Sequence, residues 1–135
     1  MITRRQGRRG NAGIEMALTL PVLLLLLGGI VDFGLYFSDA QKANHAVRQA
    51  ARAAAGTDYD LAPQAIGEAT LSEQLALFSL PTGTDTTRSV VVDSTTGLVT
   101  VTYHAPYEGL VGLVASSDNL KLGASMTLTM EDLHP

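Results

Sequence analysis

The sequence contains no cysteine. That absence excludes disulfide bonds, thiolate metal sites and a cysteine nucleophile. Basic residues are also scarce after the first ten positions: without residues 1–10, five basic residues stand against thirteen acidic ones, and the formal charge changes from -4 to -8. A body this acidic argues against nucleic acid as a partner.

Charge is unevenly placed at the N-terminus. Residues 1–10 hold no acid and four arginines, and the sixteen residues 16–31 that soon follow hold no charge at all. Because a basic cluster before an apolar run stays on the cytoplasmic side, the sequence predicts a cytoplasmic N-terminus, with everything after Phe37 across the membrane. With 135 residues, the chain has room for one anchor and one small domain.

Two acids bracket the apolar run. Glu15 and Asp32 are seventeen helical steps apart, about 26 Å, against a hydrocarbon core of about 30 Å, so we expect a single transmembrane helix with one acid near each interface. We expect Asp32 to be a solvated interfacial acid, followed by aromatic residues at headgroup depth. Pro21 and Gly28-Gly29 predict a kink or local unwinding within the span.

Glu15 itself has two readings. A carboxylate retained beside a membrane segment points to a function, but it also fits the cytoplasmic edge of an ordinary anchor, from which it would reach the headgroups. A third reading of the whole N-terminus is a secretory signal cleaved after Ser38-Asp39-Ala40, which would release a soluble product beginning near Gln41.

The helical pattern continues beyond the membrane segment. Residues 38–55 lack glycine and proline, are rich in alanine, and place four small apolar residues on one face: Ala43, Val47, Ala50 and Ala54. Gly56 is suited to the position just past a helix end. The sequence therefore predicts one helix of about forty residues, with a face made for close helix packing.

The rest of the chain predicts a small mixed domain. Pro63 favours the start of a second helix to about Phe78, whose expected buried stripe is Ile66, Ala69, Leu71, Leu75 and Phe78. Residues 88–93 and 98–103 read as a hairpin, and residues 120–131 alternate strictly between apolar and polar. We predict an α+β fold with a small antiparallel sheet on the long helix, and an apolar loop, 105–119, that covers the core edge or contacts another subunit.

Nothing in the sequence indicates catalysis or a cofactor. The three histidines lie far apart without metal-ligand spacing, and neither a nucleophile elbow nor a glycine-rich phosphate loop is present. We therefore assign no catalytic, cofactor-binding or metal-binding residues, and we do not expect an enzyme.

One motif does carry a resemblance. The run Gly10-Asn11-Ala12-Gly13-Ile14-Glu15 resembles a type IV prepilin processing site, with a basic leader ending in glycine and a glutamate at the fifth position after the cut. Residues 8–37, the alanine-rich helix ending in AARAAAG and the last strand LKLGASMTLTMED together resemble TadE-like minor pilins, or pseudopilins, of the tight-adherence (Flp) type IV pilus.

The resemblance implies a pilin-like protein divided into a leader (1–10), a transmembrane helix (11–37), its extracytoplasmic continuation (38–56) and an ectodomain (57–135). A prepilin peptidase would cut between Gly10 and Asn11, and Glu15 would pair with the freed α-amine of a neighbouring subunit during assembly. The implied partners are the peptidase, other pilins and pseudopilins, the assembly platform and the cytoplasmic membrane. The rival function is a single-span anchor whose ectodomain binds an envelope ligand and which is not cut at Gly10.

Overall fold

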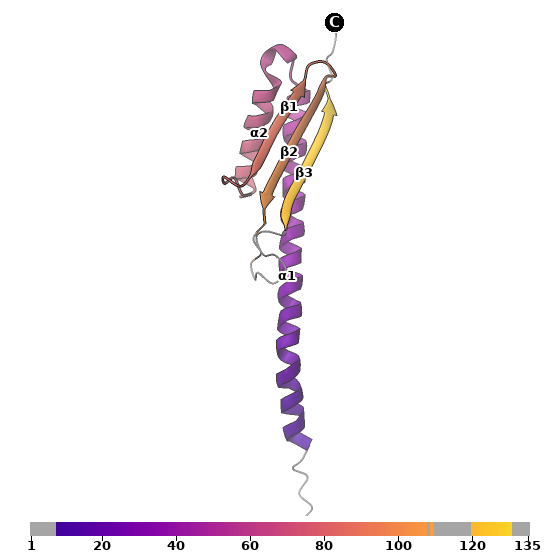
Figure 1. The fold of residues 1–135 in the computed structure, drawn as a ribbon, viewed down its shortest axis with the longest axis vertical. Coiled ribbons are helices and arrows are strands. Elements are labelled where there is room, and N and C mark those ends of the chain that lie inside the picture. The colour runs from indigo at the N-terminus through magenta and orange to yellow at the C-terminus, as the bar shows by residue number, and fades with distance from the viewer. Residues whose placement is uncertain (1–7, 108, 110–119, 131–135) are drawn as a thin grey trace, which may run out of the picture.

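The computed structural model describes residues 8–107, 109 and 120–130. A very long helix carries a small domain at its C-terminal half, and its N-terminal half projects alone (Figure 1). The elements are, in order, α1 (Arg8–Ala55), a short 3-10 helix (Tyr59–Leu61), α2 (Pro63–Leu77), β1 (Thr87–Asp93), β2 (Leu98–Pro106) and β3 (Lys121–Thr129). The predicted α+β fold, a long apolar helix with a small antiparallel sheet, is confirmed.

Helix α1 is a single unbroken helix of 48 residues. The predicted unwinding is wrong: helical structure continues through Pro21 and through Gly28 and Gly29. Leucines on both sides of Pro21, which are good helix formers, support the helix there, and one missing amide donor does not end it.

The second half of α1 forms the centre of the domain. The predicted face is confirmed, since Ala43, Val47, Ala50 and Ala54 are all buried. These small side chains let α2 approach closely. α2 lies close at Gly67, where an added Cβ would be 3.0 Å from a Val90 methyl and 3.1 Å from the Ala54 Cβ.

That approach explains where the predicted stripe of α2 is wrong. Leu71 and Leu75 are buried as expected and Phe78 is partly buried, but Ile66 and Ala69 are exposed and Gly67 is buried instead. The contact face of α2 is therefore turned toward its glycine, where an added side chain would meet α1 and β1 at short distance.

The three strands form an antiparallel sheet in the order β1-β2-β3. The predicted hairpin and the alternation of the last strand are both confirmed: Val99, Val101 and Tyr103 of β2 and Leu122 and Ala124 of β3 are buried. Val101 lies opposite Val90 on one side and Met126 on the other. Serine and threonine recur among the outward residues, and the Thr100 and Thr127 hydroxyls are 3.2 Å apart.

The hairpin turn between β1 and β2 is fixed by one carboxylate. Asp93 accepts hydrogen bonds from the Thr95 amide at 2.9 Å and the Thr96 hydroxyl at 2.7 Å. These bonds lower the pKa of Asp93, the Thr96 hydroxyl most. Gly97 takes the left-handed conformation that ends the turn, with φ of 65°.

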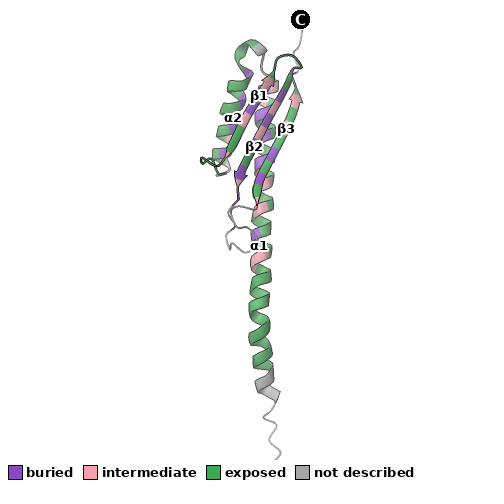
Figure 2. Cartoon of the chain, in the orientation of Figure 1, coloured by how far each residue is buried: buried purple, intermediate pink, exposed green. Residues whose placement is uncertain are grey.

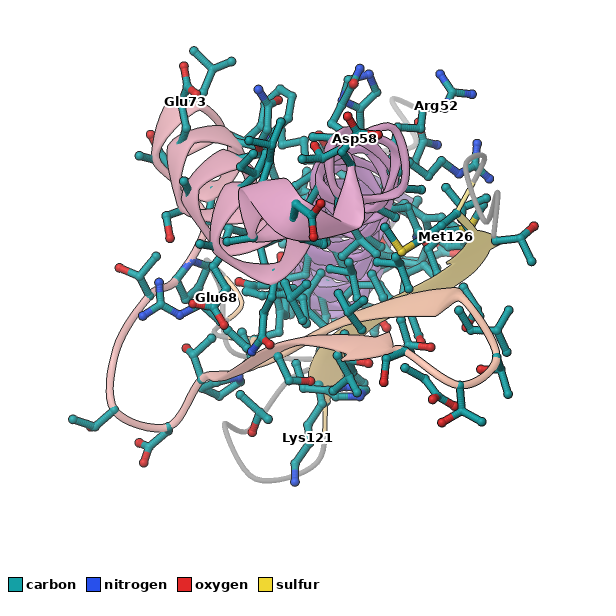
Figure 3. The ribbon with its side chains drawn as sticks, turned by 90° about the horizontal axis from the view of Figure 1, so that it is seen from above. Arg52, Asp58, Glu68, Glu73, Lys121 and Met126 are labelled. Carbon is teal, nitrogen blue, oxygen red and sulfur yellow. The ribbon has the colours of Figure 1, made fainter. Side chains whose placement is uncertain are left out.

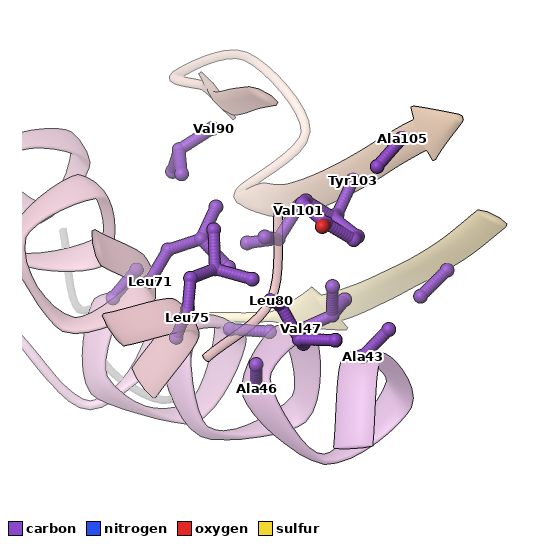
Figure 4. Close-up of a cluster of buried hydrophobic side chains, with 14 of the residues drawn as sticks. Ala43, Ala46, Val47, Leu71, Leu75, Leu80, Val90, Val101, Tyr103 and Ala105 are labelled. Atoms are coloured by element: carbon purple, nitrogen blue, oxygen red, sulfur yellow. The ribbon is translucent and has the colours of Figure 1, made fainter. Parts of the chain in front are cut away.

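The domain has two layers, with both helices on one face of the sheet and no described helix or strand on the other face (Figure 3). Between them lies one apolar core, shown in Figure 4, to which α1 contributes Ala43, Ala46 and Val47, α2 contributes Leu71 and Leu75, and the sheet contributes Val90, Val101, Tyr103 and Ala105. Most of the predicted apolar loop, 105–119, lies outside the described residues. Its first residues, Ala105 and Tyr107, are buried.

Candidate functional site

The N-terminal half of α1 is apolar and uncovered. Large side chains from Ile14 to Val31 are 47–70% exposed. Figure 2 shows this length of the helix as largely exposed, whereas the upper half carries buried residues among exposed ones. By length and composition the helix can cross a membrane. In water so continuous an apolar surface would be very unfavourable, and a bilayer removes that penalty.

The predicted processing site lies at the start of this helix. Gly10 and Asn11 are in its first helical turns, and Glu15 follows one turn later with an exposed side chain. Among the described side chains, from Ala12 onward, none donates a hydrogen bond to the Glu15 carboxylate. Thr19, one turn further on, donates its hydroxyl to the Glu15 carbonyl oxygen at 3.0 Å, which satisfies this polar group within the helix.

Asp32 differs from its prediction as a solvated acid. Only 1% of it is exposed, because Tyr107 and Gly109, which follow β2, lie against α1 at this point. The Tyr107 hydroxyl donates to the Asp32 carbonyl oxygen at 3.4 Å, and a Cβ placed on Gly109 would lie 3.0 Å from the Asp32 carboxylate. The domain thus begins at Asp32, and the two acids of α1 have different surroundings.

Aromatic side chains surround the point where the domain meets the bare helix. Phe33 and Phe37 stay about half exposed, whereas Tyr36 turns toward the domain and packs edge-on against Tyr107, with ring centres 5.2 Å apart. The Tyr36 hydroxyl donates to the Lys121 carbonyl oxygen at 3.4 Å. Burial is the main cause that raises the pKa of Tyr107. One turn of α1 therefore carries both exposed aromatics and aromatics that belong to the domain.

The structure does not bring the histidines together. His45 packs edge-on against Phe78 at 5.6 Å, His104 lies on β2 beside Gly123, and His134 lies outside the described residues. Within the described part of the chain, no group of three His, Cys, Asp or Glu residues is placed to hold a metal ion.

A bare apolar helix whose continuation is packed into a small α+β domain defines a class: proteins with one membrane-spanning N-terminal helix and a domain beyond it. Residues 10–52 match the model of a family described as TadE-like protein. The match covers the apolar half of α1 and most of its packed continuation, including Gly10, Asn11 and Glu15, and it confirms the resemblance over these residues. No curated protein and no solved structure matches the chain.

Proposed function

We propose that this protein is a minor pilin, or pseudopilin, that acts in the assembly of a Flp (Tad) type IV pilus. The observation that carries the proposal is the exposed Glu15 on an otherwise uncharged and uncovered helix segment, within the stretch that matches the TadE-like family. About eighty residues follow Gly56, and this favours a minor subunit, because the major subunits of Flp pili consist of little beyond the helix.

In this proposal a prepilin peptidase cuts between Gly10 and Asn11 on the cytoplasmic side of the membrane. The cut removes the four arginines of the leader and creates a new α-amine four residues, or about 6 Å along the helix, before Glu15. The peptidase does the chemistry, and the protein itself is not an enzyme.

Glu15 then pairs with the freed α-amine of a neighbouring subunit. In a medium of low dielectric constant, a carboxylate and an ammonium group each carry a large desolvation penalty alone, and pairing offsets both. Such a pair fixes the relative depth of two helices more than it adds net stability. The other partners are the remaining pilins and pseudopilins and the assembly platform in the cytoplasmic membrane.

The first test is the N-terminus of the membrane-extracted protein, measured by intact and peptide mass with and without the cognate prepilin peptidase. The proposal expects a chain that begins at Asn11 only when the peptidase is present. A chain that still begins at Met1 would support the uncleaved anchor with a ligand-binding ectodomain. One that begins near Gln41 would support a secreted domain.

The second test concerns Glu15. The Glu15→Ala variant should be inserted and processed normally, because the cut between Gly10 and Asn11 does not involve residue 15. Surface piliation should nevertheless fall to the level of a clean deletion. Glu73→Ala, which removes an exposed acid on α2, is the matched control and should leave piliation unchanged. Normal piliation in Glu15→Ala or in the deletion strain would contradict the assembly role.

A further inference from the structure

A small recess opens between helix α2 and strand β1, away from the bare segment of α1. It has a volume of about 230 Å³. Three residues of α2 and three consecutive residues of β1 line it: Glu68, Leu71, Ser72, Arg88, Ser89 and Val90. Leu71 and Val90 are almost fully buried and belong to the core, so the recess has an apolar floor and a polar rim.

The recess lies beside an unpaired sheet edge. β1 pairs with β2 on one side, and within the described strands it has no strand neighbour on the other. A free edge presents a row of backbone donors and acceptors, and an extended peptide can add to such an edge, with alternate side chains entering adjoining pockets. The edge has a strong β-forming sequence, Val90-Val91-Val92, and Val91 is 55% exposed.

Charge at the rim restricts the kind of peptide. Arg88 and Val90 face the helix layer, and Arg88 forms no ion pair with any described carboxylate. Glu68, on the other rim, accepts a hydrogen bond from Gln64 of its own helix at 3.2 Å. Figure 3 shows Glu68 on the side of α2 nearer the sheet and Glu73 on the far side.

From this geometry we infer that the α2/β1 recess is a binding site for an extended segment of another protein, added as a fourth strand along β1. Residues directly opposite each other on adjacent strands face the same side of a sheet. The segment therefore carries an acidic side chain opposite Arg88 and, two residues away, a small apolar side chain opposite Val90 that enters the recess.

A second copy of β1 fits this site less well. In an antiparallel pairing centred on Val90, Arg88 would lie opposite Val92, so the guanidinium would gain no acid. In that register a second copy of β1 offers Arg88 no acid, which favours a segment of another protein as the occupant. This inference does not depend on the pilus role. The recess is lined by α2 and β1 in the domain, whereas Gly10 and Glu15 lie at the N-terminal end of α1.

The test uses the full-length protein in detergent micelles and two capped synthetic peptides. One reads Thr-Glu-Thr-Val-Thr-Glu-Thr and presents glutamate opposite Arg88 in either strand direction; the other has lysine in place of both glutamates. Amide shifts of Ser89 and Val91 in NMR titrations report binding at β1. The acidic peptide should bind two- to fivefold more tightly, about the range of one exposed ion pair. Since the protein is net negative, nonspecific attraction would favour the lysine peptide instead.

Charge reversal completes the test. Arg88→Glu should invert the preference between the peptides, whereas Lys121→Glu, a reversal at the start of β3, should leave it unchanged. Arg88→Gln, which should abolish the preference, replaces Arg88→Glu if that variant does not fold. The inference is overturned if neither peptide shifts the β1 amides, if both bind the natural protein equally, or if Lys121→Glu acts as Arg88→Glu does; Arg88 would then only guard the edge against pairing.

Discussion

Tyr103→Phe removes a hydroxyl that ties the sheet to the loop after α2. Tyr103 is fully buried in β2, and its hydroxyl donates to the Pro81 carbonyl oxygen at 2.8 Å. Loss of a neutral hydrogen bond of this length lowers the free energy of unfolding by about 0.5–1.5 kcal/mol. Near neutral pH we therefore expect Tyr103→Phe to be less stable than the natural protein by this amount.

The pH dependence makes the prediction specific. Burial raises the pKa of Tyr103 from 10.0 to about 12. Because the folded state favours the neutral form of this phenol, the contribution of the phenol to the free energy of unfolding is fully present below pH 10. That contribution is lost as the pH rises from 10 through 12. For these two pKa values the loss is roughly 1.4 kcal/mol at pH 11 and approaches about 2.7 kcal/mol above pH 12.

The free energy of unfolding should therefore fall with rising pH above pH 10 more steeply in the natural protein than in Tyr103→Phe. We expect the natural protein to be more stable at pH 8 and the two stability curves to meet near pH 11, because phenylalanine does not titrate while the other tyrosines and lysines titrate in both proteins. Chemical unfolding of the full chain in detergent, followed by circular dichroism at pH 8 to 11.5, measures both curves. Parallel curves above pH 10 would refute the argument that burial of this hydroxyl controls its ionisation.

Three further predictions concern the domain. Leu75→Ala should lower the free energy of unfolding by about 2–5 kcal/mol, because it empties a fully buried position, whereas Leu77→Ala, at a 70% exposed position, should change it little in the same denaturation assay. Gly67→Ala gains about 0.8–1 kcal/mol of helix propensity but forces a Cβ to 3.0 Å from a Val90 methyl; overpacking costs about 1–3 kcal/mol, so a net loss is expected, and a rise in melting temperature would contradict it. Asp93→Asn should melt at a lower temperature at pH 7, and the difference should vanish as the pH falls through the lowered pKa of Asp93, since protonation removes the same charge; a difference that persists at pH 2 would exclude this cause.

Much of the fold could be predicted because its signals are local. The alternation from Leu122 onward and the small-residue face from Ala43 to Ala54 each depend on residues a few positions apart, and both are confirmed. The helix through Pro21 shows the limit of a local rule, since one breaker is outweighed by a long run of helix formers.

The remaining errors arise where distant parts of the chain meet. Asp32 is buried by Tyr107 and its neighbours, which lie 75 residues away in sequence, so its own surroundings gave no signal. Gly67 faces inward, close to Ala54 and Val90, and this rotation of α2 leaves Ile66 exposed. Gly10, Asn11 and Glu15 were identified through the resemblance of their motif to a prepilin processing site, and their roles are proposals that the experiments above would test.

Because α1 is continuous, the anchor and the domain turn together about the helix axis. No hinge interrupts the helix between Ala12 and Ala55, so the azimuth of Glu15 about the helix axis determines the direction in which the sheet faces. One residue inserted between these two regions would turn the sheet by about 100° and move it about 1.5 Å relative to the anchor. Any contact that fixes the rotation of the helix within the membrane therefore also fixes the direction in which the free edge of β1 faces beyond the membrane.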